Sequence, residues 1–94
     1  EPRAGDSERE ALVVSLADAN TGAHIRGAKV HVEILDPKGK VEARPLQAMI
    51  TAGYPDYSEV FNFGWTGKYA IRMTIRLNGS TVPLKATFVH NHVI

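Results

Sequence analysis

One stretch of the sequence, residues 67–79, alternates so regularly that it constrains the fold more than any other part of the chain. From position 69 the odd residues are large and apolar, while the even ones are mostly polar; the odd ones are Tyr69, Ile71, Met73, Ile75 and Leu77. Successive side chains of a β-strand point to opposite faces, whereas a helix would scatter both sets around its circumference. Asn78-Gly79 follows, and this pair favours a two-residue type I′ hairpin because both central residues need φ > 0. The pattern predicts a central strand that turns directly into its neighbour.

Further strands are predicted on both sides of this stretch, at 11–18, 29–35, 57–63 and 81–93, with an interruption at Pro83. In the strand predicted at 29–35, every second residue is apolar and faces the core. His31 and Glu33 lie between these residues and therefore point away from the core. Asp36-Pro37-Lys38-Gly39 fits a type I turn, and Gly53-Tyr54-Pro55-Asp56 is predicted to be a break. The secondary structure of residues 41–50 is not decided by the sequence. Pro45 favours an edge strand or an irregular crossing, but a short helical turn fits equally well.

About seven short strands with turn signals roughly every 8–12 residues, and no convincing helix, indicate an all-β immunoglobulin-like Greek-key β-sandwich. Gly67-Lys68-Tyr69 fits the tyrosine corner of such folds, in which the hydroxyl bonds to the backbone upstream. The alternative is a tyrosine that simply starts a strand. Residues 1–10 are polar and are predicted to be a flexible leader, which leaves residues 11–94 as a single domain.

Composition narrows the classes of function. The 94 residues include no cysteine, which excludes disulfides, thiolate nucleophiles and cysteine-ligated metals. Eleven basic and ten acidic residues give a net charge of +1, so a strongly basic nucleic-acid binder is excluded. No apolar run approaches the ~20 residues of a membrane span. The sequence also shows no Gly-rich phosphate loop and no HExxH motif, and its serines have no recognisable His-acid partners. We therefore expect no enzyme.

The one constellation with metal chemistry is His90-Asn91-His92. Positions i and i+2 of a strand face the same side about 7 Å apart, so the two imidazoles can converge on one ion. Neutral imidazole suits zinc and copper(II). Their parity continues that of Leu84, Ala86 and Phe88, which are predicted core residues, so the pair would line the open end of the sandwich. His31 is the first candidate for a third ligand; the others are His24 and Glu33. The alternative is two solvated histidines near the end of the chain.

Aromatic residues suggest a second kind of site. Trp65 lies between Gly64 and Gly67 and is expected to cover one end of the core. If it were exposed together with Tyr54 and Tyr57, the three would form a surface for a protein partner.

Part of the chain resembles a known group of domains. The quoted residues are Leu16-Ala17-Asp18, Thr21-Gly22, Ile25-Arg26-Gly27-Ala28-Lys29-Val30 and Gly67-Lys68-Tyr69-Ala70-Ile71. Over residues 11–77 this pattern resembles immunoglobulin-like and prealbumin-like bacterial sandwich domains, and among them the YtkA-like domains. The resemblance implies a periplasmic or extracellular, non-catalytic domain associated with copper biology. Transthyretin-like hydrolases share the same succession of strand and turn signals, but the sequence shows no counterpart of their Tyr-Arg-Gly-Ser tail.

Together these observations predict a non-catalytic exported binding module that coordinates copper or zinc through His90 and His92, with His31 as a third ligand. The alternative is a structural or protein-interaction domain that uses a sheet face or an edge strand against a protein partner.

Overall fold

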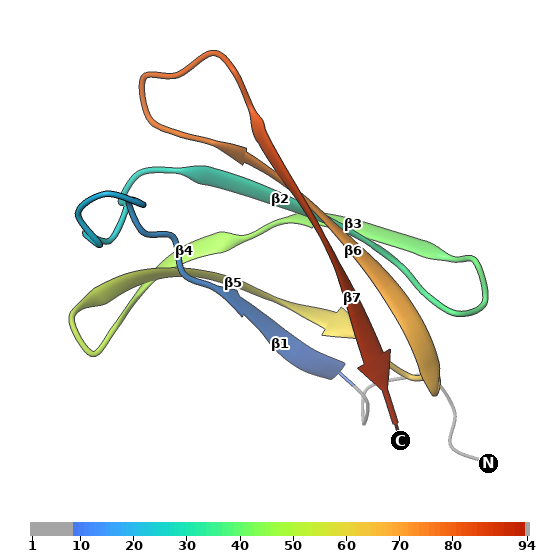
Figure 1. Cartoon of the computed structure of the whole chain (residues 1–94). Helices are drawn as coiled ribbons and strands as arrows, with labels where there is room; N and C mark the ends of the chain where they lie inside the picture. The colour runs from blue at the N-terminus through green and yellow to red at the C-terminus, as the bar shows by residue number, and fades with distance from the viewer. Residues whose placement is uncertain (1–8, 94) are drawn as a thin grey trace.

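The computed structural model describes residues 9–93, apart from the side chain of Thr51, and these form an all-β protein (Figure 1). Seven strands make two antiparallel sheets that pack as a β-sandwich, which confirms the predicted fold class. The strands are β1 (Arg9–Val14), β2 (Lys29–Leu35), β3 (Val41–Pro45), β4 (Gln47–Thr51), β5 (Tyr54–Asn62), β6 (Gly67–Arg76) and β7 (Leu84–His92). Within residues 9–93, no helix is long and apolar enough to cross a membrane.

The first strand begins at Arg9, two residues before the predicted domain start at Ala11. The rest of the predicted leader, residues 1–8, lies outside the described residues. The strand also ends earlier than predicted, at Val14, and an isolated bridge between Ala17 and His24 follows it.

The two sheets have the orders β1-β5-β4 and β3-β2-β6-β7. These orders correspond to strands B-E-D and C′-C-F-G of an immunoglobulin-like sandwich. In that fold a strand A pairs with the outer edge of B, but none of the described strands occupies this place beside β1. The outer edges of β1 and β7 are therefore both unpaired within residues 9–93.

The core between the sheets follows the predicted parity. Odd residues of β6 and even residues of β2 are buried, and they face buried aromatic residues of β5 and of the segment after it; the buried set is Val30, Val32, Ile34, Tyr57, Phe61, Phe63, Tyr69, Ile71, Met73 and Ile75. His31 and Glu33 point to the opposite face, as predicted. Burial of this apolar face is the main favourable term for such a domain.

A tyrosine corner joins the sheets between β5 and β6. The Tyr69 hydroxyl donates a hydrogen bond to the Trp65 carbonyl (2.8 Å) and accepts one from the Trp65 amide (3.0 Å). The predicted corner is confirmed, because a tyrosine that only started the strand would not bond to the backbone upstream.

Residues 41–51 form two edge strands that belong to different sheets, so the helical alternative is wrong. The crossing occurs at Leu46, whose amide donates to the Val30 carbonyl (2.8 Å) while its side chain is buried. Pro45 lies at the end of the edge strand β3, where no neighbour needs its missing N–H.

The predicted break at residues 53–56 is wrong except at Gly53, because β5 starts at Tyr54. Ala52 and Gly53 both have positive φ and form the two-residue turn between β4 and β5. In such a hairpin the second pair from the turn, Ile50 with Pro55, exchanges no backbone hydrogen bonds. The proline is therefore tolerated within the strand.

The predicted tight hairpin at Asn78-Gly79 is also wrong, although β6 does pair with β7. The last pair is Ile75 with Leu84, and a single turn within the connecting loop is closed by the Ser80 amide on the Leu77 carbonyl. A two-residue turn would have extended the ladder to Leu77 and Ser80 and placed Pro83 opposite Thr74. Shifting the register by two residues keeps Pro83 in the loop.

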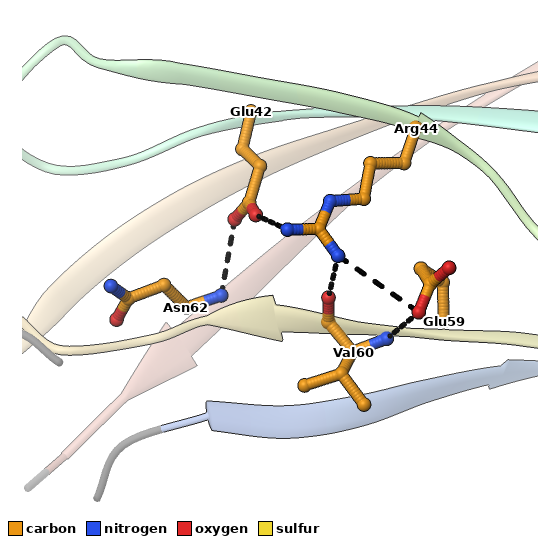
Figure 2. Close-up of polar contacts among 5 residues, drawn as sticks. All are labelled: Glu42, Arg44, Glu59, Val60 and Asn62. Atoms are coloured by element: carbon orange, nitrogen blue, oxygen red, sulfur yellow. Dashed lines mark hydrogen bonds and ion pairs between the residues drawn. The ribbon is translucent and has the colours of Figure 1, made fainter. Parts of the chain in front are cut away.

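The two open flanks of the sandwich differ. Between β3 and β5, Arg44 reaches across to the other sheet: its Nη1 donates to the Val60 carbonyl (3.0 Å) and lies 3.9 Å from Glu59 (Figure 2). Its Nη2 pairs with Glu42 at 3.0 Å, and Glu42 accepts the Asn62 amide at 3.1 Å. We call these residues the Arg44 clasp. The flank between β1 and β7 is apolar instead.

Candidate functional site

His90 and His92 lie together at one end of the core. In the β6–β7 ladder His90 is opposite Tyr69 and His92 is opposite Gly67, so both imidazoles point to the core side of the sheet. Their ring centroids lie 5.4 and 5.6 Å from that of Phe63, and the two imidazole centroids are 5.3 Å apart. The tyrosine corner holds Tyr69 beneath them. This end of the sandwich is thus closed by four rings.

The facing nitrogens of the pair are close. Nε2 of His90 and Nδ1 of His92 are 3.2 Å apart. Two nitrogens bound to one zinc ion at 2.0–2.1 Å with tetrahedral angles are about 3.3 Å apart. Without an ion, the same distance suits a hydrogen bond in which one ring donates to the other. The pair therefore has the spacing of two ligands of one metal ion.

The other nitrogen of His92 faces a carboxylate. Its Nε2 lies 3.6 Å from an oxygen of Glu10 on β1, and it is buried without a hydrogen bond. The carboxylate favours the proton on Nε2, which leaves the lone pair of Nδ1 directed toward His90. A carboxylate behind a histidine is also the usual outer-shell partner of a metal ligand.

The structure does not bring His31 to this pair. His31 is opposite Thr74 on β6, on the outer face, whereas His90 is opposite Tyr69 on the inner face and five residues away along the same strand. His31 instead shares a shallow outer pocket with Glu33 and Lys85. Its predicted role as third ligand is not supported by this placement.

The other two candidates for a third ligand are also distant. His24 packs on Tyr54 (4.6 Å between centroids) at the start of β5, while the pair packs on Phe63 beyond the end of that strand, about 30 Å away. Glu33 pairs with Arg72 on the outer face at 3.5 Å. Among residues 9–93, no group of three or more histidine, aspartate or glutamate side chains is placed to hold a metal ion.

The three aromatic residues predicted to bind a partner do not form one surface. Tyr57 is a core residue, and its hydroxyl donates to the Ile25 carbonyl (2.8 Å) and accepts the Ala28 amide (3.2 Å). Tyr54 is exposed at the start of β5. Trp65 is half-buried beyond the other end of that strand, with Lys38 Nζ 4.8 Å from its ring centroid. The prediction is wrong for Tyr57, because strand parity directs it inward with Phe61.

The sequence reasoning missed the apolar flank between β1 and β7. A groove of about 500 Å³ runs along it, with Leu12 and Val14 on one wall, Ala86 and Phe88 on the other and β6 as its floor. Leu84 and Phe88, predicted as core, are each 52 % exposed here. The available signal was β7 itself, which carries apolar residues at both parities (Leu84, Phe88 and Val89). A strand that is apolar on both faces needs a cover on each side.

The chain was compared with protein-family models, with curated proteins and with solved structures, and none of the three comparisons found a match.

Proposed function

We propose that this protein is a non-catalytic exported binding module that takes up one divalent transition-metal ion, copper(II) or zinc, on His90 and His92. The observation that carries the proposal is the 3.2 Å separation of His90 Nε2 and His92 Nδ1, which is close to that of two nitrogens on one ion. Export is supported by the resemblance to YtkA-like domains described above.

Glu10 strengthens this proposal because it sets the tautomer. With its proton on Nε2, facing the carboxylate, His92 presents an unprotonated Nδ1 to the ion. His90 donates the hydrogen bond between the two rings from Nε2, so its proton must move to Nδ1 before Nε2 can bind the ion in place of the hydrogen bond.

The two nitrogens fill two of the four positions that zinc or copper(II) commonly uses. Water or a donor from another molecule would occupy the rest, which suits temporary holding and transfer of an ion better than permanent structural binding. His90 is exposed, so an incoming ligand can reach this side of the pair.

The test is a titration with zinc and with copper(II). Zinc is followed by the imidazole NMR signals, and copper by the loss of those same signals through paramagnetic broadening. We expect His90 and His92 to respond together, with saturation at one ion per chain, and His90→Ala to abolish the response. His31→Ala and His24→Ala are the matched controls and should bind as the parent does. A response that needs a large excess of metal, or that His31→Ala also removes, would contradict the proposal.

A second candidate function is that of a protein-interaction domain. It is favoured by the apolar groove and by the exposed apolar residues of the neighbouring strand β7, Leu84, Phe88 and Val89. Contiguous exposed apolar surface on a small domain commonly marks an interaction site.

A further inference from the structure

The last strand, β7, is an unprotected sheet edge. The sandwich has four edge strands among its described residues, and three of them carry the usual protection against edge pairing. The strand β3 is short and contains Glu42, Arg44 and Pro45; β4 has only five residues; β1 has six and starts with Arg9-Glu10. In contrast, β7 is nine residues long, with Lys85 as its one formally charged residue at neutral pH and neither proline nor glycine.

The sequence of β7 is also complementary to itself. In an antiparallel pair of identical strands that uses the whole of Leu84–His92, the two-fold axis passes through the middle residue, Phe88. The two Phe88 rings then face each other across the axis. Lys85 lies opposite Asn91, Ala86 opposite His90 and Thr87 opposite Val89. No like charges are opposed, and residues directly opposite each other share a face.

We propose that β7 pairs antiparallel with β7 of a second copy of this chain about a two-fold axis at Phe88, joining the two four-stranded sheets into one. The pairing satisfies the free backbone groups of both edges and covers side chains that are now more than half exposed: Phe88 on the core side and Val89 on the outer side. It rests on the second candidate function, interaction through this flank, and is independent of the metal proposal.

The first test is the mass of the chain in solution, by sedimentation equilibrium in EDTA at concentrations up to about 1 mM. We expect a reversible monomer–dimer equilibrium. Val89→Lys should raise the dissociation constant about tenfold or more. The introduced lysine lies diagonally across from Lys85 of the second copy, and the two-fold axis produces this like-charge contact twice. Val13→Lys on β1 is the matched control, since Val13 and Val89 are 58 % and 59 % exposed, and it should change the constant less than twofold.

The second test fixes the register. The chain has no cysteine, so introduced thiols report only on each other. A mixture of Thr87→Cys and Val89→Cys chains should form a disulfide between the two variants, because opposite Cα atoms are 4.5–5.5 Å apart. Neither variant alone should cross-link to itself. Self-linking of Thr87→Cys or of Val89→Cys would place the axis at that residue and overturn the register proposed here.

Other outcomes overturn the dimer itself: a single chain at every concentration, or equal effects of the two lysine substitutions. Metal bridging is separated by the EDTA, because a dimer held through an ion on His90 and His92 would dissociate when the ion is removed. A dimer that forms only when zinc or copper is added would overturn strand pairing while supporting the metal site.

Discussion

The hydroxyl of Tyr69 satisfies both backbone groups of Trp65, donating to its carbonyl at 2.8 Å and accepting from its amide at 3.0 Å. One side chain thus closes the corner between the two sheets and also fixes the ring on which His90 and His92 lie. Tyr69 therefore supports both the fold and the candidate site.

We therefore expect Tyr69→Phe to lower the free energy of unfolding by about 2 kcal/mol, since it leaves two partly buried backbone groups without their partner. Urea denaturation measures the change. Tyr54→Phe, at an exposed tyrosine, is the control and should stay within about 0.5 kcal/mol of the parent. Equal losses for both variants would show that the corner is not the source of the stability.

The Arg44 clasp should contribute less. Arg44→Gln removes the bond to the Val60 carbonyl and two ion pairs, but the side chain is 35 % exposed, so we expect a loss of about 1 kcal/mol. Arg72→Gln, whose ion pair with Glu33 has the arginine 67 % exposed, should cost less than about 0.5 kcal/mol. The difference between the two variants should shrink in 1 M salt if the ion pairs dominate and persist if the carbonyl bond does.

Asp18 gives a pH-dependent prediction. Hydrogen bonds from the Asn20 and Thr21 amides hold the pKa of its carboxyl below the ordinary value of 3.8. Because the folded pKa is below the unfolded one, the stabilisation is present above pH 3.8 and disappears as the pH falls through the folded pKa. Asp18→Ala should thus be less stable than the parent at pH 7, with the gap closing in acid. A carboxyl titration by NMR with a midpoint at or above 3.8 would contradict this.

Ala52 is the one non-glycine residue with positive φ (51°) between residues 9 and 93. The left-handed region costs alanine about 1 kcal/mol, whereas asparagine tolerates it and Asn-Gly is the preferred type I′ turn. We expect Ala52→Asn to stabilise the protein by about 0.5–1 kcal/mol in thermal or urea unfolding. Ala52→Val should destabilise it, because a β-branched residue fits this conformation poorly.

Much of the fold could be predicted because strand parity is local. Alternation in β6 and β2 identified the buried faces, and the same rule placed His90 and His92 on one side of β7. The same rule predicts that Tyr57 is buried, because it lies on the same face of β5 as Phe61. What parity cannot supply is register. Asn78-Gly79 favoured a tight hairpin, but the observed ladder is shifted by two residues from that register, which keeps the same parity and leaves Pro83 in the loop.

The structure does not support the prediction of His31 as third ligand, for a related reason. His31 and His90 lie far apart in the sequence, and only the order of strands in the sheet decides whether they meet. The sheet places both on neighbours of β6, yet on opposite faces. The Glu10 carboxylate was equally inaccessible to sequence reasoning, because it reaches His92 from the other sheet and was assigned to the leader.

Glu10 therefore provides the sharpest test of the metal proposal. Glu10→Gln keeps the size of the side chain but removes the charge that holds the His92 proton on Nε2, so we expect zinc affinity to fall about tenfold. Isothermal titration with zinc measures it, in the monomeric Val89→Lys background if the parent self-associates. Glu33→Gln, on the outer face, is the matched control and should bind as the parent does. If both variants lose affinity equally, the effect is the change in net charge; if neither does, Glu10 does not orient His92 and the pair binds without its help.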